Sequence, residues 1–236
     1  MLTLVTLAPA DLPNRVGAVI LAAGASSRMG RPKLLLPWSG GTVLSHLVAL
    51  WQELGVKQVA VVYAAANKEL LVELNHLDFP MAHRIINPVP QEGMFSSIRC
   101  AAKWQGWLPE ITELAIVLGD QPQLRLSTLR ALLRFSAAHS GQVCQPSCGG
   151  KRGHPVVIPR RLFNQLSTSA APTLKDFLAR SAETVRMCWV NDPGLHLDID
   201  RPEDYERVRQ LLQAGSPTRP NGQPGAKPGI GTTNRP

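Results

Sequence analysis

Residues 16–33, VGAVILAAGASSRMGRPK, decide the fold of this chain. The stretch up to Ala23 is apolar or small and has the length of a buried strand, and polar residues begin abruptly at Gly24. The loop that follows contains two glycines, two serines and three cations (Arg28, Arg31 and Lys33), but no acidic residue. A strand that delivers such a loop predicts a polyphosphate site, although a strand followed by a solvated basic turn would show the same pattern.

The loop lacks the common phosphate-binding motifs. Arg31 and Pro32 separate Gly30 from Lys33, whereas a Walker A motif has adjacent glycine and lysine, and the dinucleotide fingerprint is also missing. LAAGASSRMGRPK instead resembles the signature L-A-A/G-G-x-S-x-R-M-G-x-x-K of MobA-like nucleotidyltransferases. That resemblance implies an α/β fold with three α/β/α layers, Rossmann-like (GT-A-like), with a mostly parallel central sheet. It also implies that the following residues bind the nucleotide: Leu21, Ala22, Ala23, Gly24, Ser26, Ser27, Arg28 and Lys33.

The residues after the loop predict a parallel sheet. A helix with one apolar face starts near Thr42 and ends at Gly55, and residues 58–63 form the next strand. Ligands bind beyond the carboxyl ends of strands in sheets built from such strand-helix-strand units, which is where the basic loop lies. We expect further helices over 67–77, 96–107, 127–141, 160–166, 173–180 and from Pro202, and further strands over 81–86, 113–118, 142–146, 153–159, 184–190 and 195–200.

Composition and charge limit the class of protein. The 236 residues are 44% hydrophobic, which suits one α/β domain over residues 15–214, after a loose leader (1–14) that does not resemble a signal peptide. The net charge is +8, but residues 216–236 carry +3 of it in a proline- and glycine-rich tail (215–236) expected to be disordered. We therefore expect no nucleic-acid binding. Because no apolar run approaches the ~20 residues of a membrane-spanning helix, we also expect no membrane span. The four cysteines form no C-x-x-C pair, so we expect no zinc site and reduced thiols in the cytoplasm.

Two acidic segments are candidates for metal binding. ELAIVLGDQP (113–122) reads as a buried strand that ends at Asp120, which can either cap a turn or hold Mg²⁺ beside phosphates. In LHLDID (195–200), Asp198 and Asp200 would share one face of a strand. GDQP resembles the metal-binding motif of the family, and DIDRPED resembles its D-x-D-x-P-E-D segment, with Arg201 where many relatives have threonine. The resemblance implies that Asp120 and Asp200 bind Mg²⁺.

Two further segments are candidates for substrate contacts. Gly93 permits a sharp turn before a helix in which Ser96 and Ser97 lie in the first turn; these serines either cap the helix or, as the resemblance implies, contribute to the nucleotide pocket. The resemblance also assigns GHPV, with Gly153, His154 and Pro155, to the acceptor side. From the residues alone, His154 can equally be packed or solvated. The neighbouring residues Lys151 and Arg152 can meet an acceptor phosphate or form a solvated turn.

The resemblance implies a Mg²⁺-dependent transfer in which Arg28, Lys33 and Asp120 are catalytic. Ala23, the GDQP segment and GHPV are most similar to the molybdenum cofactor cytidylyltransferase (MocA-type) branch, whereas the guanylyltransferase branch typically has glycine at Ala23. The expected substrates are CTP and molybdopterin cofactor, and a recipient molybdoenzyme is an expected partner. A guanylyltransferase, a sugar-1-phosphate nucleotidyltransferase or a non-catalytic carrier of molybdopterin or nucleotide are the alternatives.

Overall fold

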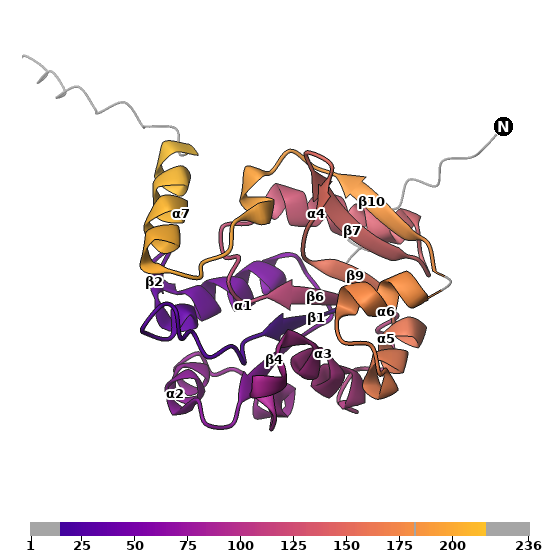
Figure 1. Cartoon of the computed structure of the whole chain (residues 1–236), viewed down its shortest axis with the longest axis horizontal. Helices are drawn as coiled ribbons and strands as arrows, with labels where there is room; N and C mark the ends of the chain where they lie inside the picture. The colour runs from indigo at the N-terminus through magenta and orange to yellow at the C-terminus, as the bar shows by residue number, and fades with distance from the viewer. Residues whose placement is uncertain (1–14, 182, 216–236) are drawn as a thin grey trace, which may run out of the picture.

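The structure is a computed structural model that describes residues 15–181 and 183–215. The expected leader (1–14) and all but the first residue of the expected tail lie outside the described residues. Eight strands form one sheet with the order β10-β7-β9-β6-β1-β4-β5, and β8 pairs with β7 at its side (Figure 1). The strands are β1 (Val16–Leu21), β4 (Gln58–Ala64), β5 (Arg84–Asn87), β6 (Glu113–Leu118), β7 (Val143–Cys148), β8 (Lys151–Arg152), β9 (Val156–Pro159) and β10 (Val185–Trp189).

The sheet is mostly parallel. β1 lies between β4 and β6 and is parallel to both, β4 is parallel to β5, and β10 is parallel to β7. β9 is antiparallel to β6 and to β7, which lie on either side of it. A second, two-stranded sheet is the hairpin of β2 (Pro37–Trp38) and β3 (Gly41–Thr42).

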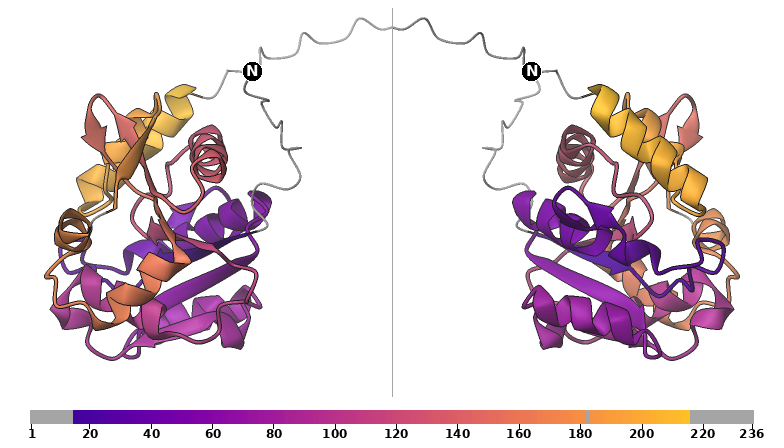
Figure 2. Two further views of the ribbon diagram at one scale, coloured as in Figure 1. Left: turned by 90° about the vertical axis from the view of Figure 1, so that its right-hand side faces the viewer. Right: turned by 90° about the vertical axis from the view of Figure 1, so that its left-hand side faces the viewer.

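Helices cover both faces of the sheet, as the side views in Figure 2 show. Alternate residues of β1 belong to different apolar clusters, because neighbouring side chains of a strand point to opposite faces. Ala18 and Ile20 pack with α1 (Val43–Glu53), α2 (Lys68–His76), α4 (Leu126–Ala138) and α7 (Pro202–Gly215). Val19 and Leu21 pack with α3 (Met94–Lys103), α5 (Arg160–Gln165) and α6 (Leu174–Arg180). The predicted three-layer α/β/α fold is confirmed.

The carboxyl ends of the central strands lie side by side. Leu21 at the end of β1 is in register with Leu118 at the end of β6, and the two arrows end next to each other in Figure 1. Gly119 continues from β6 at a point where a Cβ atom would lie 2.6 Å from the Leu21 carbonyl oxygen. A side chain at residue 119 would therefore push the two strand ends apart. Ala22 begins the loop after β1, and Asp120 is the second residue after β6.

The predicted strand over 195–200 is wrong. The segment contains the short 3-10 helix η5 (Pro193–His196) and then runs without strand pairing to Asp200. Its backbone instead makes isolated hydrogen bonds to distant residues, one to a side chain and one to another backbone group. Gln123 Nε2 donates to the carbonyl of Gly194 at 2.9 Å, and the Ile199 N–H donates to the Asp120 backbone carbonyl at 3.0 Å. The alternation of apolar and polar residues in 195–200 therefore belongs to an irregular segment that is hydrogen-bonded to the residues following β6.

Several element boundaries also differ from those expected. The helix expected to start at Ser127 starts at Leu126, because Asp192 from a distant segment accepts the Arg125 N–H at 3.1 Å and replaces a local serine cap. α3 ends at Lys103, and the Trp107 indole N–H donates to the Ala101 carbonyl that the helix end leaves free.

The start of the strand expected at 81–86 and the packing of the last helix also differ from expectation. The strand expected from Met81 begins at Arg84, because the turn η2 (Met81–His83) follows Pro80. The spacing of Tyr205, Val208, Leu211 and Leu212 predicts one apolar face of the last helix. In the structure, however, Leu211 is 52% exposed, and α7 packs through Tyr205 and Val208. Over the described residues, no helix combines the length and apolar character that crossing a membrane requires. The remaining 3-10 helices are η1 (Lys33–Leu35), η3 (Pro90–Glu92) and η4 (Leu166–Thr168).

Candidate active site

Two cavities flank the segment 23–25 that leaves β1. The first has a volume of about 300 Å³ and extends from this segment past the start of α3 to the end of β6. The second, of about 460 Å³, lies between the same segment and the residues that follow β4. Both volumes are in the range of small-ligand sites. The cavities share Ala23, Gly24, Ala25 and Pro90 in their linings.

The basic loop after β1 is folded back on itself. Ser26 adopts a left-handed backbone conformation (φ +52°), and its hydroxyl oxygen accepts the backbone N–H of Lys33 at 3.1 Å. Met29 is buried in the core on the α1 side of the sheet. These contacts place Lys33 at the start of η1, with its side chain in the lining of the first cavity.

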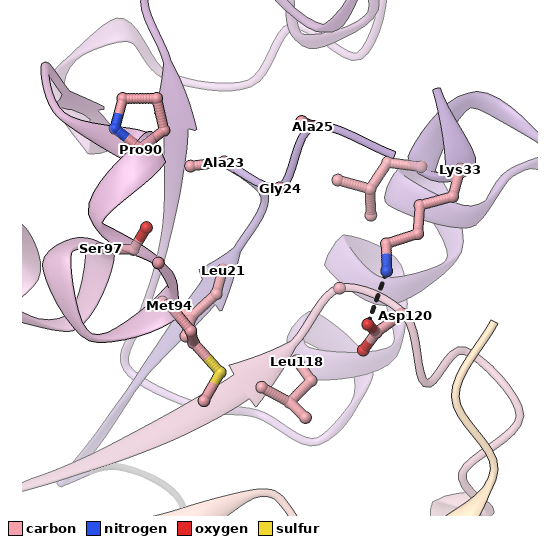
Figure 3. A pocket seen from close by; sticks show the side chains of 13 residues that line it. Leu21, Ala23, Gly24, Ala25, Lys33, Pro90, Met94, Ser97, Leu118 and Asp120 are labelled. Carbon is pink, nitrogen blue, oxygen red and sulfur yellow. Dashed lines mark hydrogen bonds and ion pairs between the residues drawn. The ribbon is translucent and has the colours of Figure 1, made fainter. Parts of the chain in front are cut away.

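The cations of the loop meet the two aspartates that follow the strand ends. Lys33 Nζ lies 2.7 Å from Asp120 Oδ2 and 3.3 Å from Asp200 Oδ1, and the Lys33–Asp120 pair is drawn in Figure 3. The Arg28 guanidinium lies 2.8 Å from Asp200 Oδ2. The Arg28 side chain is 63% exposed and that of Lys33 only 16%, so Lys33 is the cation held inside the site. The structure thus brings the predicted phosphate-binding cations and the predicted metal ligands into one charged cluster.

The donor set suits a hard divalent cation. Asp120 Oδ1 is buried and has no hydrogen-bond partner within the described residues, although burying an ionised oxygen without a partner is costly. Asp200 is close enough to share the Lys33 ammonium with Asp120. Mg²⁺ typically takes one or two carboxylates and completes its coordination with water and phosphate oxygens. In the described part of the chain, no group of three or more His, Cys, Asp or Glu side chains forms a metal site. A cation held by Asp120 and Asp200 would therefore take its remaining ligands from water or phosphate.

A third carboxylate, Asp198, lies near the pair and was not assigned to the site from the sequence. Gln121 Nε2 donates to Asp198 Oδ1 at 2.8 Å. Burial raises the pKa of Asp198, with a further contribution from the charge of Asp120, while the hydrogen bond from Gln121 lowers it. The signal available in the sequence was the glutamine of GDQP, whose partner lies far along the chain.

The predicted acceptor residues differ in their access to the site. Gly153 is buried, and a Cβ atom there would lie 2.4 Å from Leu195 Cγ, so this glycine serves close packing. Pro155 is also buried. His154 is half-buried, with Nδ1 3.4 Å from the carbonyl oxygen of Ile116. Burial lowers the pKa of His154, against smaller opposing contributions from this carbonyl and from Asp120 and Asp198.

The two predicted serines, Ser96 and Ser97, lie in the first turn of α3 and have different surroundings. Gly93 has φ +87° and forms the N-cap of α3, a conformation that favours glycine. Both serines are buried, but Ser97 lines the first cavity and Ser96 lines neither cavity. Neither serine caps the helix, since the N-cap position belongs to Gly93 and has no side-chain cap. Asn87, which contacts both serines, was missed because a lone asparagine before a proline reads as a turn residue.

The other predicted nucleotide contacts can now be placed. Ala22, the first residue after β1, is buried, and its N–H is used in a hydrogen bond to the Val62 carbonyl of β4 at 2.7 Å. Ser27 is exposed, and neither residue lines a cavity. The predicted residues that line a cavity are Leu21, Ala23, Gly24, Ser26, Lys33, Gly93, Ser97 and Asp120. Lining residues that the sequence did not indicate include Pro90, Met94, Ala64 and Asn67.

Comparisons with known proteins find relatives over most of the chain. The family model of the MobA-like NTP transferase domain matches residues 18–185. Molybdenum cofactor cytidylyltransferase of Escherichia coli is 24% identical over 84% of this chain and 97% of its own length. Nicotine blue oxidoreductase of Paenarthrobacter nicotinovorans is 28% identical over 84% of this chain and 98% of its own length.

A solved structure gives the same result for the fold. A nucleotidyl transferase from Methanothermobacter superposes with a TM-score of 0.70 at 22% identity, covering 86% of this chain and all of its own. The family match spans most of the described residues, including most of β1, the basic loop and Asp120. The chain therefore belongs to the MobA-like NTP transferase family and is a nucleotidyltransferase.

Proposed function

We propose that this chain transfers CMP from CTP to the phosphate of molybdopterin, releasing pyrophosphate, with Mg²⁺ as cofactor. The cytidylyltransferase relative supports this choice of substrates. The observation that carries the proposal is the convergence of Asp120, Asp200 and Lys33 beside a cavity in the size range of small-ligand sites at the strand ends. Ala23, which lines both cavities, is the residue whose methyl group supports cytosine over guanine, by resemblance to the two branches of the family.

Asp120 and Asp200 would hold the Mg²⁺. When bound there, the cation would offset the negative charge of the triphosphate and make pyrophosphate a better leaving group. The unpartnered Asp120 Oδ1 supports this assignment, because its lone pairs have no other use among the described residues.

Arg28 and Lys33 bind the phosphates in this proposal. Their charges are now neutralised by the aspartates, and they become available to phosphate oxygens once the carboxylates are engaged by another cation. Arg28 is exposed enough to turn toward a ligand without unpacking the core. Both side chains would then stabilise the charge that develops on the departing pyrophosphate.

The acceptor needs no general base. A phosphate monoester has a second pKa of about 6 and is mostly dianionic at neutral pH. Its oxygen forms the new bond to the α-phosphorus while the bond from that phosphorus to the bridging oxygen breaks, and the electron pair leaves with pyrophosphate. His154, whose pKa is lowered by burial, is neutral in this pH range and would contribute hydrogen bonding and shape on the acceptor side.

Product identification tests the proposal directly. The protein is incubated with Mg²⁺ and an equimolar mixture of CTP, GTP, ATP and UTP, in one reaction with molybdopterin and in a parallel reaction with a sugar 1-phosphate. Pyrophosphate release and product mass are measured in both. We expect pyrophosphate and the cytosine dinucleotide. The guanine dinucleotide would overturn the base assignment, and a sugar-1-phosphate accepted in place of molybdopterin would overturn the acceptor. A carrier, or a protein with redox chemistry like that named for the nicotine blue relative, would release no pyrophosphate above background.

A further inference from the structure

Asn87, the last residue of β5, is completely buried beside the site. Its Oδ1 accepts the backbone N–H of Val89 at 2.9 Å and the thiol of Cys100 at 3.7 Å. A backbone N–H can only donate, so this contact fixes which end of the amide is oxygen. The two Nδ2 hydrogens therefore point toward α3.

Both hydrogens are used on neighbouring serines. Asn87 Nδ2 donates to the hydroxyl oxygen of Ser96 at 2.8 Å and to that of Ser97 at 3.0 Å. Each hydroxyl consequently acts as an acceptor toward Asn87 and has its own O–H left to donate. The buried amide of Asn87 thus sets the hydrogen-bond polarity of both hydroxyl groups, meaning that each accepts from Asn87 and donates elsewhere.

The two serines use this remaining hydrogen differently. The Ser96 hydroxyl donates within the protein, with the carbonyl oxygens of Gly93 at 2.7 Å and Val89 at 3.1 Å as acceptors. The Ser97 hydroxyl donates no hydrogen bond to any of the residues that the structure describes, and it lines the first cavity. Figure 3 shows Ser97 and Pro90 across the cavity from the Lys33–Asp120 pair, with the segment that leaves β1 between them.

We propose that Asn87 is a positioning residue that holds the Ser97 hydroxyl as a hydrogen-bond donor directed into the nucleotide cavity. The ligand atom opposite Ser97 must then be an acceptor, such as a base carbonyl or a phosphate oxygen, and a donor group at this point is disfavoured. The inference rests on the proposed function, because it takes the ligand of this cavity to be a nucleotide.

Asn87→Asp reverses this polarity with little change in volume. The new carboxylate still accepts the Val89 N–H, but its second oxygen accepts the serine hydroxyls instead of donating to them. The Ser97 O–H then turns away from the cavity and its lone pairs face the ligand acceptor. We expect CTP affinity, measured by calorimetry with Mg²⁺, to fall about 10- to 100-fold in Asn87→Asp and about 3- to 10-fold in Ser97→Ala.

The decisive readout is the coupling between the two residues. In a Ser97→Ala background, Asn87→Asp should change CTP affinity by less than about 2-fold, since the hydroxyl through which it acts is gone. In a matched Ser96→Ala background, the full penalty of Asn87→Asp should persist. A penalty of Asn87→Asp that is equal in all three backgrounds would show a merely structural role and overturn the inference.

Asn87→Ala provides a second route if the aspartate variant does not fold, as thermal melting will show. It leaves the Ser97 hydroxyl free to rotate, so CTP affinity should fall less than in Asn87→Asp and again not fall in the Ser97→Ala background. If the wild-type protein binds GTP in place of CTP, the same cycle is run with GTP, and the proposed base fails while the inference is still decided. Binding of no nucleotide by the wild-type protein would overturn both.

Discussion

The two aspartates of the site come from segments of opposite character. Asp120 follows β6, a central strand with β1 on one side and β9 on the other, and Gly119 allows the strand ends to meet closely. Asp200 ends a segment without strand pairing, which is held by side-chain contacts from Gln121 and Gln123 and by the bond between Ile199 N–H and the Asp120 carbonyl. The site therefore has two halves. The first half, Asp120, is held by the sheet, whereas the second half, Asp200, is held by hydrogen bonds between distant parts of the chain.

The largest effect is expected at the sheet-supported half. Asp120→Asn should lower turnover at least about 100-fold, because it removes one negative charge where the cation and the departing pyrophosphate are stabilised. The melting temperature should change little, since the substitution preserves shape. Steady-state pyrophosphate release measures the effect, and Asp78→Asn, an exposed aspartate with φ +48° that asparagine tolerates, is the matched control. Wild-type turnover in Asp120→Asn would contradict the assignment.

The link between the two halves is Lys33, and its removal should strengthen metal binding while it abolishes catalysis. In Lys33→Met, the ammonium that lies 2.7 Å from Asp120 and 3.3 Å from Asp200 no longer competes for the carboxylates. We expect the affinity for Mn²⁺, measured without nucleotide by electron paramagnetic resonance, to rise about tenfold.

The control for this prediction is a lysine at the other end of the sheet. Lys57→Met, an exposed residue just before β4, removes the same charge far from the strand ends that carry the aspartates. It should leave Mn²⁺ affinity within about 2-fold of wild type. Equal affinity in wild type and Lys33→Met would mean that the two carboxylates do not bind the cation together.

Loosening the second half should produce an intermediate effect. Gln123 is buried and donates to the carbonyls of Gly194 and Leu197. Gln123→Leu leaves both carbonyls without this donor, so the free energy of unfolding in urea should fall by about 1–3 kcal/mol. Mn²⁺ affinity should fall severalfold through Asp200, and exposed Gln210→Leu should change neither quantity. An unchanged affinity in a destabilised Gln123→Leu protein would show that Asp200 does not need this support.

The same contrast explains what the sequence could predict. The apolar runs that became β1 and β6 indicated buried strands, and in the structure Leu21 at the end of β1 and Asp120 after β6 line the first cavity. The alternation in 195–200 indicated a strand that does not exist, because its apolar residues face a core while its backbone bonds to glutamines far away in the chain. The role of Asn87 could not be predicted from the sequence either, because it depends on the direction of hydrogen bonds to Ser96 and Ser97 that form only in the folded chain.

The smallest effect is expected at His154, which lies where the two halves meet. Its ring contacts the Ile116 carbonyl of β6 and experiences the charges of Asp120 and Asp198. Because burial lowers the pKa of His154, the unfolded chain takes up a proton near pH 6.5 before the folded protein does. The contribution of His154 to the free energy of unfolding is therefore complete above pH 6.5. It is lost as the pH falls toward the lowered pKa, by no more than about 1.4 kcal/mol per pH unit.

His154→Asn should remove this share of the acid sensitivity. Urea unfolding at pH 7.5 and pH 5.5 measures it, and the loss of unfolding free energy between these values should be smaller in the variant than in wild type. Because burial also lowers the pKa of His46 and His83, part of the loss should remain. His76→Asn on the exposed side of α2 is the control. If His154→Asn lost as much stability as wild type over this range, the histidine would be free to ionise in the folded protein, and the boundary between the two halves would be open to water.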